Sequence, residues 1–167
     1  MENAFEHYLN DHLAGATGAI LLIGDLAKRQ EDDTERLFFQ NLQEEVSGDR
    51  DLLTALIRRA GMEEKIIAKV TGDVGARAGK LKLMWDGLEP GKLGYFEALE
   101  ILALGIQGKR LLWTVLGEVA SLYPEWTGVD FEALAKSAKR QRDEVEQRRL
   151  NSGRATLPSP ERLPVGS

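Results

Sequence analysis

The sequence contains no cysteine, which excludes disulfide bonds, thiolate metal sites and cysteine nucleophiles. It also lacks both glycine-rich patterns that cradle phosphates, GxGxxG and GxxxxGK[ST], so no nucleotide site is indicated. No serine stands in the context of a hydrolase nucleophile, and a Ser-His-Asp triad therefore has no support. These absences remove the commonest motif-encoded enzyme classes and leave the charged residues and the two histidines as the chemistry-bearing groups.

A basic surface and a long apolar segment are lacking as well. The chain carries 22 Lys plus Arg against 27 Asp plus Glu, a net charge of −5, which disfavours general binding to nucleic acid. The uncharged run Leu13–Gly24 is shorter than the about 20 apolar residues that cross a bilayer. The first residues are polar and acidic, unlike a secretory signal. We therefore expect a cytoplasmic protein with no nucleic-acid or membrane partner.

The patterns that are present predict an all-α protein. Its 167 residues suit a single domain, and apolar residues recur at helical spacing along most of the chain. The expected helices cover, by residue number, 3–28, 34–60, 63–85, 93–122 and 130–150. We expect the third to be short or broken, because Gly72, Gly75 and Gly79 weaken it. The fourth is apolar around most of its circumference and should be the most buried. Residues 1–150 then form the helical bundle, and residues 151–167 form a flexible or surface-lying tail.

Polar residues interrupt the apolar stripes of the first two helices. His12 falls in the middle of the first stripe and Asp49 in the middle of the second, with Glu45 one turn from Asp49. If the hairpin turns near residue 31, antiparallel pairing places position 12 level with position 49. A histidine and two carboxylates are thus expected to face one another inside the bundle.

Carboxylates in an apolar interior need compensation. The first alternative is an internal ion-pair or hydrogen-bond network, in which His12 is protonated or Lys109, Arg50 or Arg142 reaches inward. The second is a metal ion, because imidazole and carboxylate ligands suit iron, manganese or zinc. The third is that one helix is rotated and its acids are solvated.

The fourth helix adds further candidates. Glu97 shares a helical face with an apolar set and could point inward, and Glu100 lies on an expected solvent edge. Lys109 lies among apolar residues, where it could neutralise a buried acid. The apolar set beside Glu97 is Leu104, Leu111 and Val115, together with Gly108.

Two segments carry a family resemblance. Tyr8-Leu-Asn-Asp-His-Leu-Ala-Gly15 and Leu99-Glu-Ile-Leu-Ala-Leu-Gly-Ile-Gln-Gly-Lys109, the latter followed by Leu112-Trp113, resemble a group of uncharacterised bacterial ferritin-like proteins. The resemblance implies a four-helix bundle of two up-down hairpins joined by a crossing connection. It also gives added weight to a set of polar residues as a buried network or site: Asn10, Asp11, His12, Glu100 and Lys109.

The sequence departs from the metal-binding ferritin-like enzymes, which use Glu-x-x-His on two of their helices. Gly48 stands three residues after Glu45 and Gln147 three after Glu144, and the only histidines are His7 and His12. A standard di-iron centre is not expected. An altered iron or manganese site could still use a smaller set of ligands: His12, Glu45, Asp49, Glu97 and Glu100.

Three functions follow as hypotheses. The first is a non-enzymatic or catalytically degenerate ferritin-like bundle, forming a homodimer, with a structural, stress-related or interaction role. The second is a metal-dependent oxidoreductase with a non-standard iron or manganese site around His12. The third is a carrier that holds a small apolar ligand between helices. The sequence names no substrate.

Overall fold

The computed structural model describes residues 3–65, 87–164 and 166, and within them every regular element is helical. The long helices are α1 (Ala4–Lys28), α2 (Asp33–Arg59), α5 (Leu93–Val119) and α6 (Phe131–Thr156). Three short 3₁₀ turns complete them: η2 (Ala120–Leu122), η3 (Pro124–Trp126) and η4 (Pro160–Arg162). The expected all-α class is confirmed. The expected third helix lies almost wholly outside the described residues.

Side-chain caps fix where three of the long helices begin. Asn3 accepts a hydrogen bond from the backbone N–H of Phe5 at 3.1 Å, and Asp32 accepts one from Glu35 at 2.9 Å. Asp130 accepts one from Ala133 at 2.9 Å. These oxygens satisfy N–H groups that the first turn of a helix leaves without a partner. The helices α2 and α6 begin at Asp33 and Phe131, each one residue from the starts expected at 34 and 130.

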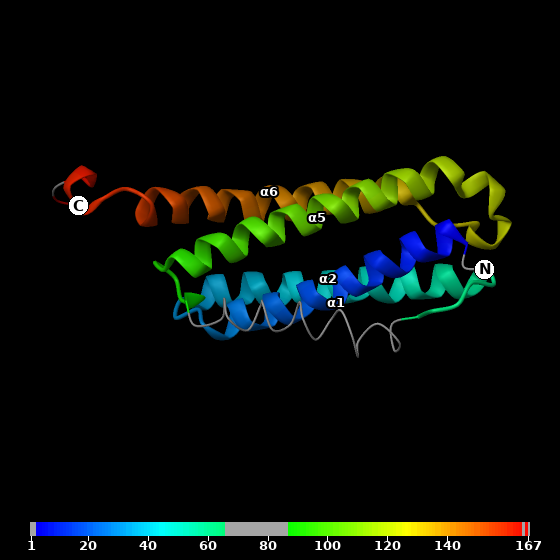
Figure 1. Cartoon of the computed structure of the whole chain (residues 1–167), viewed down its shortest axis with the longest axis horizontal. Coiled ribbons are helices and arrows are strands. Elements are labelled where there is room, and N and C mark those ends of the chain that lie inside the picture. Colours follow the sequence, from blue (N-terminus) through cyan, green and yellow to red (C-terminus); the bar gives the residue numbers. More distant parts are fainter. Residues whose placement is uncertain (1–2, 66–86, 165, 167) are drawn as a thin grey trace.

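The helices form two antiparallel hairpins, α1 with α2 and α5 with α6 (Figure 1). Most contacts between helices lie within each hairpin, and the principal helix-to-helix contact across the two is that of α1 with α5. At one end of the bundle, Trp126 of η3 donates an indole N–H bond of 2.9 Å to the carbonyl of Leu56 on α2. This turn therefore ties the second hairpin to the end of the first.

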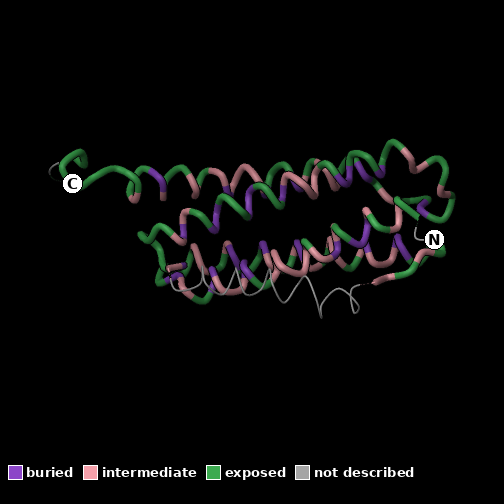
Figure 2. The backbone as a smooth tube through the Cα atoms, in the orientation of Figure 1, coloured by how far each residue is buried: buried purple, intermediate pink, exposed green. Residues whose placement is uncertain are grey.

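The buried residues lie mainly on the inner sides of both hairpins (Figure 2). The inner face of α6 carries the buried residues Phe131, Ala138 and Val145, and Leu134 on the same face is half-buried. Of the four long helices described, α5 contains the most buried residues, as predicted for the helix within residues 93–122. Its outer face is exposed, with Leu104 69% and Leu111 58% accessible. Because apolar residues surround this helix, its sequence does not indicate which side packs against other helices and which side is exposed.

Two helix ends differ from the expected ones. The last helix continues to Thr156, beyond the expected end at Leu150, because no proline interrupts it before Pro158 and Gly153 lets its backbone pack against the Phe96 ring. The fourth expected helix ends as α-helix at Val119 and continues as the η2 turn. None of the described helices is both long enough and apolar enough to cross a bilayer.

Candidate functional site

A cavity of about 450 Å³ lies between α1, α2 and α5. Much of its wall is made of small or apolar residues, and the remainder carries a few polar side chains. The small residues are Gly15, Ala16 and Ala19 on α1 and Gly105 and Gly108 on α5. The polar side chains are Tyr8, Asp11, His12, Asp49, Arg50 and Lys109.

The glycines account for part of this space. A Cβ atom built on Gly15, Gly105 or Gly108 would meet no atom within 4 Å, apart from the local helix backbone. Each glycine weakens its helix by about 1 kcal/mol relative to alanine. Their positions on the cavity wall keep the gap between α1 and α5 open.

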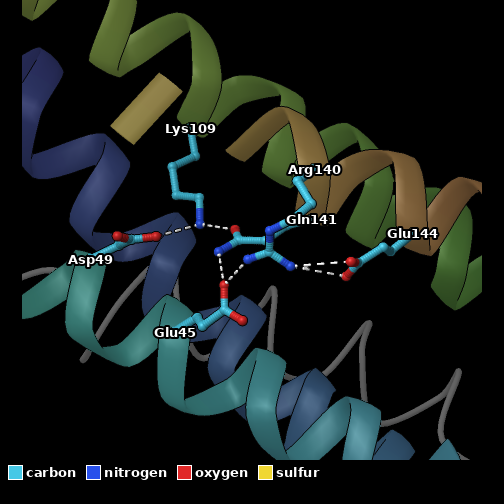
Figure 3. A network of polar contacts seen from close by, with 6 residues as sticks. All are labelled: Glu45, Asp49, Lys109, Arg140, Gln141 and Glu144. Carbon is cyan, nitrogen blue, oxygen red and sulfur yellow. Dashed lines mark hydrogen bonds and ion pairs between the residues drawn. The ribbon is translucent and has the colours of Figure 1, made fainter. Parts of the chain in front are cut away.

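Lys109 is the principal charged group of the cavity. Its ammonium group lies 2.5 Å from Oδ2 of Asp49 and 2.5 Å from Oε1 of Gln141, so it joins α5 to both α2 and α6 (Figure 3). The side chains of Lys109 and Asp49 are only 12% and 18% exposed. Apolar residues on the same side of α5 as Lys109, among them Leu102 and Trp113, are buried. The acid at position 49 is therefore compensated by a lysine of the same chain.

Glu45 continues the network one turn along α2. Its Oε2 accepts hydrogen bonds from Gln141 at 2.6 Å and from Arg140 at 2.5 Å (Figure 3). Arg140 also pairs with Glu144 on its own helix at 3.1 Å. Gln141 is 1% exposed and uses both its amide nitrogen and its carbonyl oxygen, so it links the two acids of α2 through Lys109.

His12 is half-buried on the cavity wall, where its ring makes an edge contact with Tyr8 at 4.7 Å between centroids. Burial lowers the pKa of His12 below its ordinary value of 6.5, and the charge of Asp11 partly opposes that shift. The imidazole is therefore neutral at neutral pH and does not supply a positive charge to the acids. Burial also raises the pKa of the Tyr8 hydroxyl.

The remaining predicted residues lie apart from this cluster. Asn10 is buried and cross-links the chain, donating to the carbonyls of Glu6 and Glu63 and accepting from the backbone N–H of Lys65. Asp11 is exposed and lies 3.3 Å from His7, both on α1. Asn10 is thus a structural brace, and Asp11 belongs to the rim of the cavity.

Glu97 and Glu100 are both exposed, as the solvent-edge interpretation of Glu100 predicted. Glu100 pairs with Arg149 of α6 at 3.0 Å. The inward orientation considered for Glu97 is wrong. Glu97 does share a face with Leu104 and Leu111, but that face is the exposed one. The spacing grouped these residues correctly and gave no information on which side the neighbours lie.

No group of three or more His, Asp or Glu side chains that could hold a metal ion occurs among residues 3–65, 87–164 and 166. His12, Glu45 and Asp49 thus do not come together as a ligand set, and the two acids are engaged by Lys109, Arg140 and Gln141. The arrangement matches the first alternative for compensating them, an internal ion-pair and hydrogen-bond network.

Two members of the network, Arg140 and Gln141, were not singled out from the sequence. Gln141 lies between Ala138 and Val145 at helical spacing, so it is a polar residue in an apolar stripe. That is the same signal that identified His12, and it could have identified Gln141. Arg140 stands in a charged surface run, and only the packing of α6 near α2 brings it to Glu45.

Comparison of the chain with protein-family models, with curated proteins and with solved structures yields no match.

Proposed function

We propose that this chain is a non-enzymatic binding protein that holds a small, largely apolar molecule in the cavity between α1, α2 and α5. The observation that carries the proposal is the cavity itself, whose volume of about 450 Å³ lies in the range of small-molecule sites. Its wall combines apolar side chains with a few fixed polar groups, which is the usual composition of such sites. Three of the four Asp, Arg and Lys residues on that wall have a partner within 3.3 Å, which argues against a reactive role: Asp11, Asp49 and Lys109.

A neutral fluorescent probe tests this function. N-phenyl-1-naphthylamine, whose emission rises in apolar surroundings, should bind the protein saturably. Gly105→Phe places a ring at a cavity position where a Cβ meets nothing within 4 Å, and it should weaken probe binding by about tenfold or more. Gly48→Phe is the matched control, because Gly48 is an exposed, uncrowded helical glycine outside the cavity. Equal binding by both variants would refute the proposal.

We also retain the ferritin-like bundle and the homodimer as parts of the proposal. Two antiparallel hairpins support the former. An exposed apolar stripe on the outer face of α5, defined by Ile101, Leu104, Leu111 and Val115, supports the latter. Light scattering should then give a dimer at micromolar concentration and a monomer for Leu104→Glu. A monomeric parent protein would exclude this part.

The metal-dependent oxidoreductase has less support than the binding protein, because the acids expected to hold iron or manganese are already paired with cations. Elemental analysis of protein purified without chelators separates the two. Stoichiometric iron or manganese that is lost in His12→Ala would favour the oxidoreductase over the binding protein.

A further inference from the structure

The charged side chains on the wall of the cavity differ in how closely they are paired within the chain. Lys109 and Asp49 neutralise one another at 2.5 Å, and Asp11 lies beside His7 at 3.3 Å. His12 contributes no charge at neutral pH, because burial lowers its pKa. One charged residue of the wall remains to be accounted for, Arg50 of α2.

Of the two cations on the cavity wall, Arg50 has the weaker partner. Its guanidinium lies 3.6 Å from Oδ1 of Asp51, which is beyond hydrogen-bond distance, and the Asp51 side chain is 74% exposed. Arg50 donates no hydrogen bond to any described residue, although a guanidinium carries five N–H donors. Its side chain is 33% exposed, and Arg50 is one of the residues that line the cavity.

This imbalance defines what the cavity would accept. A neutral apolar molecule would leave the donors of Arg50 to water alone. A cation would meet an arginine and would find the charge of Asp49 already neutralised by Lys109. An anionic group would complete the guanidinium in the planar, two-bond geometry that arginine forms with carboxylates and sulfonates.

We propose that the molecule bound in the cavity carries a single anionic group, a carboxylate in the simplest case, which Arg50 receives while the apolar body lies between α1 and α5. This inference rests on the proposed binding function and adds the ligand's chemical class to it. Residues on all three surrounding helices take part: Gly15 and Ala16 of α1, Arg50 of α2, and Gly105 and Gly108 of α5.

Two probes with the same aromatic skeleton test the inference. The anionic probe is 1-anilinonaphthalene-8-sulfonate, and N-phenyl-1-naphthylamine is its counterpart without the sulfonate. We expect the anionic probe to bind the parent protein about tenfold more tightly, and added salt to reduce that preference. Arg50→Gln should weaken the anionic probe by about tenfold and leave the neutral probe within about twofold. Arg50→Lys should retain part of the preference, since it keeps the charge and loses the planar donors.

The controls separate this inference from the function on which it rests. Arg59→Gln removes the same charge from an exposed position of α2 outside the cavity, and it should change neither probe. If Arg59→Gln weakened the anionic probe as much as Arg50→Gln does, the effect would come from the net charge of the protein. That result would overturn the inference. Failure of Gly105→Phe to weaken the neutral probe overturns the binding function itself. A third outcome would overturn only the proposal that the ligand is anionic. In that case Gly105→Phe abolishes binding of the neutral probe, but Arg50→Gln does not alter binding of the anionic probe.

Discussion

Lys109 of α5 contacts Asp49 of α2 at 2.5 Å, and the same ammonium group reaches Gln141 of α6. This pair joins two hairpins that make most of their contacts internally. Because both side chains are less than one-fifth exposed, each charge depends on the other for its compensation. The pair is therefore the first place at which substitutions should reveal how the hairpins are held together.

Lys109→Met should lower the free energy of unfolding by about 2–3 kcal/mol, because it leaves Asp49 largely buried without its cation. The double variant Lys109→Met/Asp49→Leu should recover much of that loss. Lys139→Met is the matched control. Lys139 pairs with Asp143 on the exposed side of α6, and its loss should cost less than about 0.5 kcal/mol. Urea denaturation measures all three, and equal effects of the two lysine variants would contradict the prediction.

The stability of the protein should depend on the protonation of His12. Burial lowers the pKa of His12 in the folded state below the value of 6.5 that it has when unfolded. The unfolded chain therefore binds the proton first as the pH falls, and the contribution of His12 is fully present above pH 6.5 and lost as the pH falls through the folded pKa. Denaturation curves from about pH 7 to about pH 5 should show this loss of stability.

His12→Gln should flatten that part of the pH profile. His7→Gln removes the other histidine, whose side chain is 51% exposed, and serves as the control. The groups that surround His12 on the cavity wall, including Tyr8, Asp11, Asp49 and Lys109, remain unchanged in both variants. A His12→Gln profile that kept the full slope would show that other groups cause the dependence.

Two helical glycines should respond to alanine in opposite directions. A Cβ on Gly48 in α2 would meet nothing within 4 Å, so Gly48→Ala should stabilise the protein by about 0.5–1 kcal/mol through helix propensity. A Cβ on Gly94 in α5 would lie 2.6 Å from the carbonyl oxygen of Gly87, and Gly94→Ala should therefore destabilise it. Melting temperatures of the two variants test this, and a shift of the same sign in both would count against the packing at Gly94.

Two fully buried tryptophans differ in whether their indole N–H has a hydrogen-bond acceptor. The indole N–H of Trp126 bonds the carbonyl of Leu56 at 2.9 Å, whereas that of Trp113 has no partner in the described structure. Both side chains lose the same volume when changed to phenylalanine. Trp126→Phe should therefore destabilise the protein by about 1 kcal/mol more than Trp113→Phe. Denaturation midpoints that were equal, or in the reverse order, would contradict this assignment.

The sequence predicted the helices well where caps and periodicity agreed. Asp32 and Asp130 cap α2 and α6 within two residues of the predicted starts at 34 and 130. The helical wheel also brought His12 and Asp49 to the wall of one cavity. These successes rest on local spacing and on one short loop, which together fix how α1 and α2 pair.

The sequence did not predict which outward-facing residues lack a neighbour. Glu97 and Leu104 share a face, but only the packing of α5 against α6 shows that this face is exposed. The pairing of Arg140 with Glu45 joins positions far apart in the chain, and periodicity within one helix contains no information on such contacts. The cavity could not be predicted for the same reason, because its size depends on the distance between α1 and α5.

The concentration of packing inside each hairpin has a mechanical consequence. Separating α5–α6 from α1–α2 at the level of the cavity would break the contacts of Lys109, Gln141 and Arg140 with α2, while the interior packing of each hairpin stayed intact. A relative displacement of the two hairpins would also break the packing of α1 against α5, but it would leave each helix intact. Such a displacement would admit a solute to the interior without melting a helix.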